Sequence, residues 1–458
     1  MRALLISANT EKIPDPVYPI GAAAVGTAAR RAGHEVEALD LCFAEDARSL
    51  VVDAIRDFGP QAVGLSLRNL DNSAYPENCS YIEDYRALVS WVRQTTEAPV
   101  VLGGAGFTVM PTTILEELHA DYGVVGEGEF AFPWLLGEIE RGGPLRDDGS
   151  FTCRSVNGGM LVSANARIKQ LDLAGEPERG LFDVHRYYER GGCVNVQTKR
   201  GCCFECVFCS YPLIEGSKVR VRSPERVVDE IADLQSRYGV RHLFFVDNIF
   251  NFPLPHAKRI CEELRRRRLD VEWSGYLNPK FVDEELVRLM AASGCKGVEF
   301  GTDSGSATMI ANLGKEFDAE DLRRSSRLCH RFGIKFAHSL IFGGPGETRE
   351  TIEETLRLMD ELEPTAVIAF TGIRVLPGTG MVELALRDGQ IDADDNLLHP
   401  KFYIARSLGE ELIATIENHA ASRSNWIVPG KGIRTNIKML QRLRDKKIKG
   451  QLWRLLRR

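Results

Sequence analysis

The sequence predicts an α/β protein made of two successive parallel-sheet domains. Short apolar runs of strand length alternate with amphipathic helical runs over residues 1–140, and the same alternation returns over residues 190–390. A chain of 458 residues is also too long for one hydrophobic core. We therefore expect domains at 1–140 and 186–390, joined by a connector at 141–185 and followed by a helical C-terminal region at 391–458.

The first domain is expected to be a doubly wound, Rossmann-like sheet with helices at 20–32 and 81–95. Its strands are expected at Ala3–Ile6, Glu35–Leu39, Ala62–Ser66, Pro99–Leu102 and Gly123–Val125. Such sheets bind ligands at the carboxyl ends of their strands. The residues that follow those ends are Ser66, Arg68, Asn69, Gly103, Gly104, Gly126 and Glu127. The order G-x-G-x-x-G is missing among them, so a dinucleotide is not indicated.

The second domain repeats a strand–helix unit and is expected to form a partial (β/α)6 barrel. Its strands are expected at Cys193–Gln197, His242–Asp247, Val271–Gly275, Gly297–Gly301, Phe336–Phe342 and Ala366–Phe370. Ser223 and Pro224 predict the start of one helix, as cap and first residue. In the full barrel the active site lies at the carboxyl ends of the strands, and we expect the same here. The connector carries a predicted hairpin about Asn157–Gly159.

Three cysteines in one short run, Cys202, Cys206 and Cys209, are the most informative residues of the chain. Thiolates are the usual ligands of a [4Fe–4S] cluster, and three of them leave one iron open to another ligand. Zinc sites favour paired C-x2-C units, whereas the remaining cysteines are scattered singly. A disulfide framework is disfavoured because eleven cysteines in 458 residues are sparse and odd in number. Cys203 is expected to be a loop residue.

The C-x3-C-x2-C spacing, with Phe208 directly before the third cysteine, resembles the radical S-adenosylmethionine (SAM) superfamily. The resemblance implies that SAM chelates the open iron through its amino and carboxylate groups and is cleaved to a 5′-deoxyadenosyl radical. Residues 342–348 are similar to the F-G-x-P-G-E-T turn of that family. The SAM contacts that the resemblance implies are Phe208, Asp247, Asn278, Asp303, Gly344, Gly346 and Arg374.

The first domain resembles the cobalamin-binding domain that precedes this core in the B12-dependent branch. The likeness rests on Pro19–Gly21, Gly103–Gly104 and Gly126–Glu129, and it implies cobalamin at the strand-end residues given above. The D-x-H-x-x-G loop, whose histidine ligates cobalt in related domains, does not occur. Arg68 is then a candidate for a cation beneath cobalt, although a salt bridge with Asp71 would explain it equally well.

These resemblances imply a cobalamin-dependent radical SAM enzyme that methylates an unactivated carbon of a small or lipid-like substrate. The same cofactors would serve ring formation, rearrangement or oxidation without methyl transfer, and a cluster- and cobalamin-binding sensor without turnover is a third reading. The enzyme readings require an external one-electron donor, of flavodoxin or ferredoxin type. The strand ends expected to contact SAM argue against the sensor, which would not need them.

Charge is concentrated at the C-terminus. Residues 431–458 hold eleven of the 58 Lys and Arg residues and one of the 64 Asp and Glu residues. A helix packed on the barrel with a solvated basic face would explain this, as would peripheral contact with an anionic membrane surface. A nucleic-acid partner is not expected, because the main body is acidic and no RNA-binding motif occurs. Unpaired cysteines and the lack of a signal peptide or spanning segment predict a cytoplasmic protein.

Overall fold

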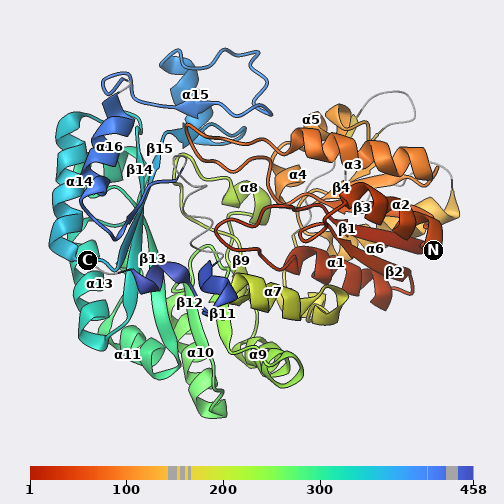
Figure 1. Cartoon of the computed structure of the whole chain (residues 1–458), viewed down its shortest axis with the longest axis horizontal. Helices are drawn as coiled ribbons and strands as arrows, with labels where there is room; N and C mark the ends of the chain where they lie inside the picture. The colour runs from red at the N-terminus through yellow and green to blue at the C-terminus, as the bar shows by residue number, and fades with distance from the viewer. Residues whose placement is uncertain (143–151, 155–159, 163–166, 410, 430–441, 457–458) are drawn as a thin grey trace. The chain divides into compact units, whose positions relative to one another are not determined.

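The computed structural model describes residues 1–142, 152–154, 160–162, 167–409, 411–429 and 442–456 (Figure 1). The chain divides into two compact units. The first comprises Met1–Asn72, Cys79–Val184 and Leu213–Gly216. The second comprises Ser73–Asn78, His185–Pro212 and Ser217–Arg458. The expected connector therefore lies in the first unit, and the C-terminal region lies in the second.

The first unit contains a sheet in the order β2-β1-β3-β4-β5-β6-β7. Its strands are β1 (Arg2–Ser7), β2 (Glu35–Asp40), β3 (Ala62–Ser66), β4 (Val100–Gly103), β5 (Tyr122–Gly123), β6 (Thr152–Arg154) and β7 (Met160–Val162). The first five are parallel, which confirms the predicted doubly wound sheet with its switch point between β1 and β3. β6 and β7 pair antiparallel as the predicted hairpin, and its turn lies outside the described residues.

Helices cover both faces of this sheet. They are α1 (Ile20–Arg31), α2 (Ala47–Phe58), α3 (Ile82–Thr95), α4 (Ala105–Val109), α5 (Pro111–Glu117) and α6 (Gly128–Arg141). Crossover connections between parallel strands are right-handed. The connection from β1 to β2 moves one way across the sheet, and the connection from β2 to β3 moves back the other way past β1. α1 and α2 consequently lie on opposite faces. The short helices η1 (Leu171–Ala174) and η2 (Arg179–Leu181) follow in the connector.

The second unit contains a parallel sheet in the order β18-β15-β14-β13-β12-β11-β8. The six strands that run consecutively are β8 (Val194–Val196), β11 (His242–Phe245), β12 (Glu272–Leu277), β13 (Cys295–Asp303), β14 (Lys335–Phe342) and β15 (Ala366–Thr371). They confirm the predicted partial barrel. β18 (Trp426–Ile427) adds a further parallel strand beside β15.

Helices lie on the outside of these strands (Figure 1). They are α9 (Pro224–Tyr238), α10 (Leu254–Arg267), α11 (Glu284–Ala292), α13 (Ala319–Phe332) and α14 (Arg349–Leu362). Pro224 opens α9 as predicted, while the side chain of Ser223 at the cap position makes no capping hydrogen bond. The shorter elements are α7 (Val184–Gly191), β9 (Lys199–Arg200), α8 (Tyr211–Glu215), β10 (Arg220–Val221), η3 (Pro279–Phe281), α12 (Ala307–Asn312), β16 (Ile373–Arg374), α15 (Gly380–Arg387), β17 (Phe402–Tyr403), α16 (Glu411–Ala421) and η4 (Leu452–Leu455).

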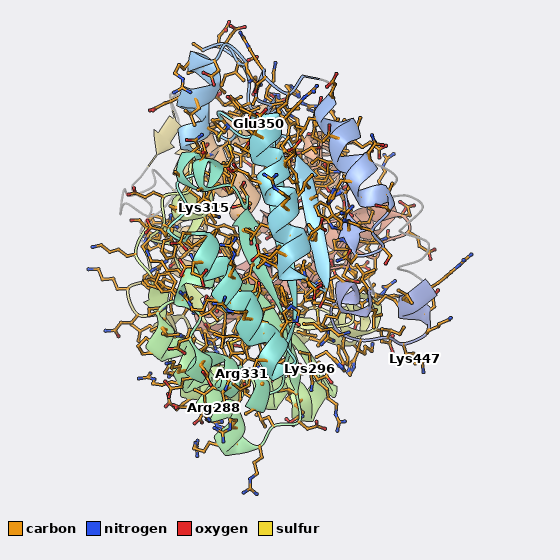
Figure 2. All side chains as sticks on the ribbon, turned by 90° about the vertical axis from the view of Figure 1, so that its left-hand side faces the viewer. Arg288, Lys296, Lys315, Arg331, Glu350 and Lys447 are labelled. Atoms are coloured by element: carbon orange, nitrogen blue, oxygen red, sulfur yellow. The ribbon has the colours of Figure 1, made fainter. Side chains whose placement is uncertain are left out.

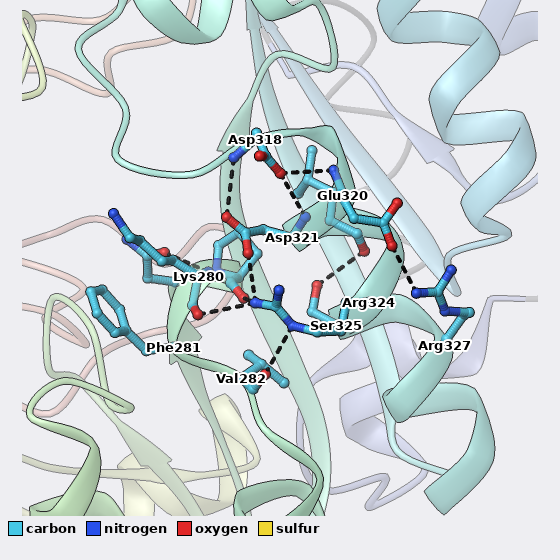
Figure 3. Close-up of polar contacts among 12 residues, drawn as sticks. Lys280, Phe281, Val282, Asp318, Glu320, Asp321, Arg324, Ser325 and Arg327 are labelled. Atoms are coloured by element: carbon cyan, nitrogen blue, oxygen red, sulfur yellow. Dashed lines mark hydrogen bonds and ion pairs between the residues drawn. The ribbon is translucent and has the colours of Figure 1, made fainter.

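The start of α13 is tied to the loop that follows β12. Asp318 and Asp321 form a capping box, which satisfies amides of the first turn (Figure 3). Arg324, on the same helix, donates to the carbonyl oxygens of Lys280 at 3.1 Å and Val282 at 3.4 Å. An outer helix thereby fixes a loop at the carboxyl ends of the strands.

A segment near the C-terminus packs on the inner face of the partial barrel, opposite the helices. Side chains alternate between the two faces of a strand, and His338 of β14 faces α13, where Ser326 lies 3.5 Å from its ring. Ala337 is therefore on the inner face. Trp453 of η4 packs against Ala337 and Ala366, and its indole N–H donates to the buried Glu299 at 2.8 Å.

This packing changes the prediction for the C-terminal region. Part of the region is strand rather than helix, because β17 pairs with β16 and β18 extends the barrel sheet. Trp453 is 7% exposed and belongs to the core, so this indole is not available to a membrane surface. Among the described residues no helix is long and apolar enough to cross a membrane. Residues 430–441, which carry part of the basic tail, lie outside the described residues.

Truncation of the Trp453 indole should destabilise the second unit. We expect Trp453→Ala to lower the free energy of unfolding by about 3–5 kcal/mol, because a large buried side chain leaves a cavity and Glu299 loses its donor. Urea denaturation measures the change. Leu455→Ala is the matched control, since Leu455 is 48% exposed two residues away, and its effect should stay within about 0.5 kcal/mol. Equal effects of the two substitutions would contradict the packing described here.

Glu299 should make stability depend on pH. Burial raises the pKa of Glu299 from 4.5 to about 7 in the folded protein. Between these values the folded state holds a proton that the unfolded state has released, so this contribution, on the order of 3 kcal/mol, is lost as pH rises from 4.5 to 7. Glu299→Gln should remove that part of the pH dependence of the urea midpoint. The control Glu353→Gln, at an exposed glutamate, should keep the pH dependence of wild type. Identical pH profiles for wild type and Glu299→Gln would show that Glu299 is not the titrating group.

Candidate functional site

The loop that carries the three cysteines follows β8 and β9 and is held by main-chain hydrogen bonds on two sides. The amide of Val207 donates to the carbonyl oxygen of Leu313 at 3.1 Å, and the carbonyl oxygen of Val207 accepts from the amide of Met381 at 2.9 Å. A turn closes the run itself, since the amide of Cys209 donates to the carbonyl oxygen of Cys206 at 3.0 Å. Main-chain hydrogen bonds thus fix the shape of the loop.

Asp247 anchors the entry to this loop. Its buried carboxylate accepts from the amide of Thr198 at 2.7 Å, from the Thr198 hydroxyl at 2.6 Å and from the amide of Lys199 at 3.2 Å. The ammonium of Lys199 in turn donates to the carbonyl oxygen of Phe252 at 3.1 Å. Burial lowers the pKa of Lys199 to about 8, against the field of Asp247. Asp247 therefore helps to hold the cysteine loop, and its assignment to SAM stays a prediction.

The three thiols gather closely enough to influence one another. Burial raises the pKa of Cys209 to about 12, and the neighbouring Cys206 and Cys202 add to the increase. Cys203 is exposed, in agreement with its prediction as a loop residue. In the part of the chain that the structure describes, no three His, Cys, Asp or Glu side chains are arranged to hold one metal ion.

Lys315 and Asp303 lie beside these cysteines. Asp303 ends β13 at a register shift, with a left-handed φ of 60°, and its carboxylate forms an ion pair with the Lys315 ammonium. The same ammonium lies 5.6 Å from the centre of the Phe208 ring. Burial raises the pKa of the Cys206 thiol, and the nearby positive charge of Lys315 opposes this increase. Burial lowers the pKa of Lys315, but Asp303 and the thiols of Cys206 and Cys209 outweigh it, and the pKa is raised. Phe208 and Asp303 are thus the two expected SAM contacts that the fold brings to the cysteines.

The glycine turn after β14 is shaped by protein neighbours. The buried carboxylate of Glu347 accepts from the amides of Gly343 and Gly344, at 3.1 Å for the latter, and burial raises the pKa of Glu347 to about 7. Gly346 has φ +78°, and a Cβ there would lie 2.8 Å from the amide nitrogen of the Asn312 side chain. The turn is thus in close contact with Glu347 and α12, and the expectation that Gly344 and Gly346 admit SAM stays a prediction.

Two further expected SAM contacts have protein partners. The Arg374 guanidinium donates to the carbonyl oxygens of Val375 at 2.6 Å and Leu397 at 2.7 Å. The side-chain oxygen of Asn278 caps η3 by accepting from the amide of Lys280 at 2.9 Å. Both residues stabilise loops at the strand ends, and their assignment to SAM stays a prediction.

In the first unit, three strand ends are joined into one edge. The amide of Leu67 donates to the carbonyl oxygen of Gly103 at 2.8 Å. The carbonyl oxygen of Leu67 accepts from the amide of Gly106 at 3.0 Å. The amide of Gly126 donates to the Thr108 hydroxyl at 2.9 Å. The residues expected at the cobalamin site, from Ser66 through Gly104 to Gly126, are therefore neighbours.

The side chains at this edge differ in availability. Arg68 is exposed and forms no ion pair within the described residues, so the alternative of a salt bridge with Asp71 is not observed. Ser66 and Asn69 are half-buried, and the Asn69 carbonyl accepts from the Tyr85 hydroxyl at 2.6 Å. Glu127 is buried, and its carboxylate accepts from the amide of Ile168 at 2.7 Å. Glu127 therefore ties the connector to the domain, whereas Arg68 faces solvent.

The fold and the two sites define a class of protein with a three-cysteine partial barrel and an N-terminal doubly wound domain. The family model of the radical SAM superfamily matches residues 196–359, and that of the B12 binding domain matches residues 6–136. The tryptophan 2-C-methyltransferase of Streptomyces laurentii is 30% identical over 440 residues, which is 82% of this chain and 73% of that protein. The chain therefore belongs to the radical SAM superfamily, in the branch that carries a B12-binding domain.

Solved structures agree with this membership. The radical SAM methyltransferase TsrM from Kitasatospora setae, with tryptophan and a SAM analogue bound, superposes with a TM-score of 0.88 at 25% identity, covering 99% of this chain and 97% of that one. Another structure of TsrM contains cobalamin and a [4Fe–4S] cluster. The anaerobic magnesium-protoporphyrin IX monomethyl ester cyclase of Rubrivivax gelatinosus is 30% identical over 286 residues, which is 58% of this chain and 49% of that protein.

Gly104 should be indispensable to the strand-end edge. It has φ +96°, and a Cβ there would lie 2.5 Å from the carbonyl oxygen of Leu67. Gly104→Ala should therefore lower the free energy of unfolding by about 1–3 kcal/mol, measured by urea denaturation. Gly103→Ala is the control, because a Cβ at Gly103 would lie 3.8 Å from its nearest neighbour, the carbonyl oxygen of Val124, which is an ordinary contact. The stability of this variant should be close to that of wild type. A Gly104→Ala protein as stable as the control would contradict this geometry.

Proposed function

We propose that this protein is a cobalamin-dependent radical SAM methyltransferase acting on a carbon of a small-molecule substrate. The observation that carries the proposal is the gathering of three thiols on a loop beside the strand ends of a partial barrel, in a chain that also carries a B12-binding domain. The similarity to tryptophan 2-C-methyltransferase, and to TsrM with its cobalamin and cluster, supports the same activity.

The residues of this chain divide the work between the two units. When bound, the cluster, SAM and cobalamin supply the electron, the radical and the transferable methyl group. Cys202, Cys206 and Cys209 would ligate three irons. Asp303, directed by its ion pair with Lys315, is our candidate for the amino group or ribose of SAM. Arg68, exposed and without an ion pair among the described residues, is our candidate for a cation at the face of cobalamin.

The inner face of the barrel supports a compact substrate. Phe244 and Tyr276 pack edge to face with centroids 5.1 Å apart, and Tyr276 remains 39% exposed. Partly exposed apolar residues continue this face on β14 and β15, namely Ile341, Ile368 and Phe370. Trp453 covers the same face at Ala337 and Ala366. An aromatic or aliphatic small molecule suits this surface better than the long lipid chain that the sequence also allowed.

Ring formation without methyl transfer is the second candidate, because the magnesium-protoporphyrin cyclase shares 30% identity over 286 residues. Ring formation would use the same cofactors as methyl transfer, so the two reactions can be distinguished by their products. A sensor without turnover has no comparable support. Either reaction needs an external one-electron donor, for which a flavodoxin- or ferredoxin-like protein is our proposal. The free cysteines agree with a reducing compartment such as the cytoplasm.

Replacement of any cluster ligand should abolish both iron binding and SAM cleavage. We expect Cys202→Ala, Cys206→Ala and Cys209→Ala to lose the iron and sulfide of the anaerobically reconstituted protein and its 5′-deoxyadenosine production. Iron content, the electron paramagnetic resonance signal after dithionite reduction and chromatography of the nucleoside measure this. The exposed Cys203→Ala is the control and should retain both. A cluster with full activity in any of the three variants would refute the ligand assignment.

A further inference from the structure

Lys315 occupies a site that the sequence pattern did not indicate. Its side chain is 10% exposed, and the ammonium forms an ion pair with Asp303 and lies 5.6 Å from the ring centres of Phe208 and Phe317. Figure 2 shows Lys315 in the upper half of the view, well above Lys296 and Arg331. A buried ammonium between two rings and a carboxylate keeps its charge and has little freedom to leave.

The backbone fixes this position. The carbonyl oxygen of Leu313 accepts a hydrogen bond from the amide of Val207 at 3.1 Å. This bond joins the segment after α12 to the cysteine loop. Gly314 has φ +67°, and a Cβ there would lie 2.7 Å from the carbonyl oxygen of Glu205. The main chain before Lys315 is thus in direct contact with the main chain before Cys206. The position of Lys315 beside the cysteines is therefore set by these main-chain contacts.

We propose that Lys315 is a positioning residue that tunes the cluster. Its ammonium holds a fixed positive charge beside the cysteine loop that would carry the cluster, while Asp303 sets its orientation. The proposal rests on the cluster assignment under the proposed function. Reduction adds one electron to an already anionic group, and a buried cation stabilises the reduced form more than the oxidised form. Lys315 therefore raises the reduction potential and eases electron entry from the donor.

The test is a redox titration of the full-length reconstituted protein, followed by electron paramagnetic resonance, with neither SAM nor substrate present. We expect Lys315→Met to bind wild-type amounts of iron and to reduce at a more negative potential. The one-electron reduction equilibrium should fall at least tenfold, which is 59 mV. The unpaired Asp303 carboxylate left behind acts in the same direction. Lys315→Arg should restore most of the potential, and Lys296→Met, an exposed lysine at the start of β13, should leave it unchanged.

The outcomes separate this inference from the proposed function. A Lys315→Met protein with full iron and an unshifted potential overturns the inference and leaves Lys315 as a structural partner of Asp303. If Lys315→Met loses iron, Lys315→Gln keeps a hydrogen-bond donor without the charge. A negative shift in Lys315→Gln supports the role, and an unshifted potential overturns it. A wild-type protein that takes up no iron defeats the proposed function, and the inference with it.

Discussion

The carboxylate of Asp247 makes the contacts on which the rest of the second unit depends. Three hydrogen bonds to Thr198 and Lys199 bind the end of β11 to the first residues after β8. A carboxylate buried to 1% exposure is costly unless such bonds compensate it, so the arrangement holds only if the loop enters at this point. The cysteine run starts three residues beyond Lys199. Its thiols are thereby brought to Asp303 and Lys315, on segments far away in sequence.

The strands and the cysteine loop could be predicted because their signals are local. Apolar runs of four to eight residues mark strands whatever surrounds them, and three cysteines on one loop carry their ligand chemistry with them. The roles of Asp247, Glu127 and Arg374 could not be predicted in this way. A polar residue at a strand end faces either a ligand or the protein, and only tertiary contacts decide which. Each of the three makes hydrogen bonds to protein backbone.

Lys315 was not predicted for a different reason, and the place of Trp453 was predicted only in part. We expected ligand contacts among the residues that follow strands. Lys315 follows a six-residue helix instead, so this expectation did not include it. The sequence allowed a helix packed on the barrel in the basic segment that holds Trp453. The indole does pack on the barrel, but it does so from a short 3-10 helix and against Ala337 and Ala366 on the inner face. β18, with two residues, is too short for any periodic pattern. Small residues on two neighbouring strands and a large side chain far along the sequence meet only in the folded structure, so no local pattern indicates the contact.

The most direct test of the account is an anaerobic assay of the reconstituted, reduced protein with SAM, with and without cobalamin. L-tryptophan and other small aromatic molecules serve as trial substrates, and 5′-deoxyadenosine and S-adenosylhomocysteine are quantified together. The account predicts both nucleoside products, with S-adenosylhomocysteine appearing only when cobalamin is present. 5′-Deoxyadenosine alone, at any cobalamin concentration, would contradict methyl transfer and favour the ring-forming alternative.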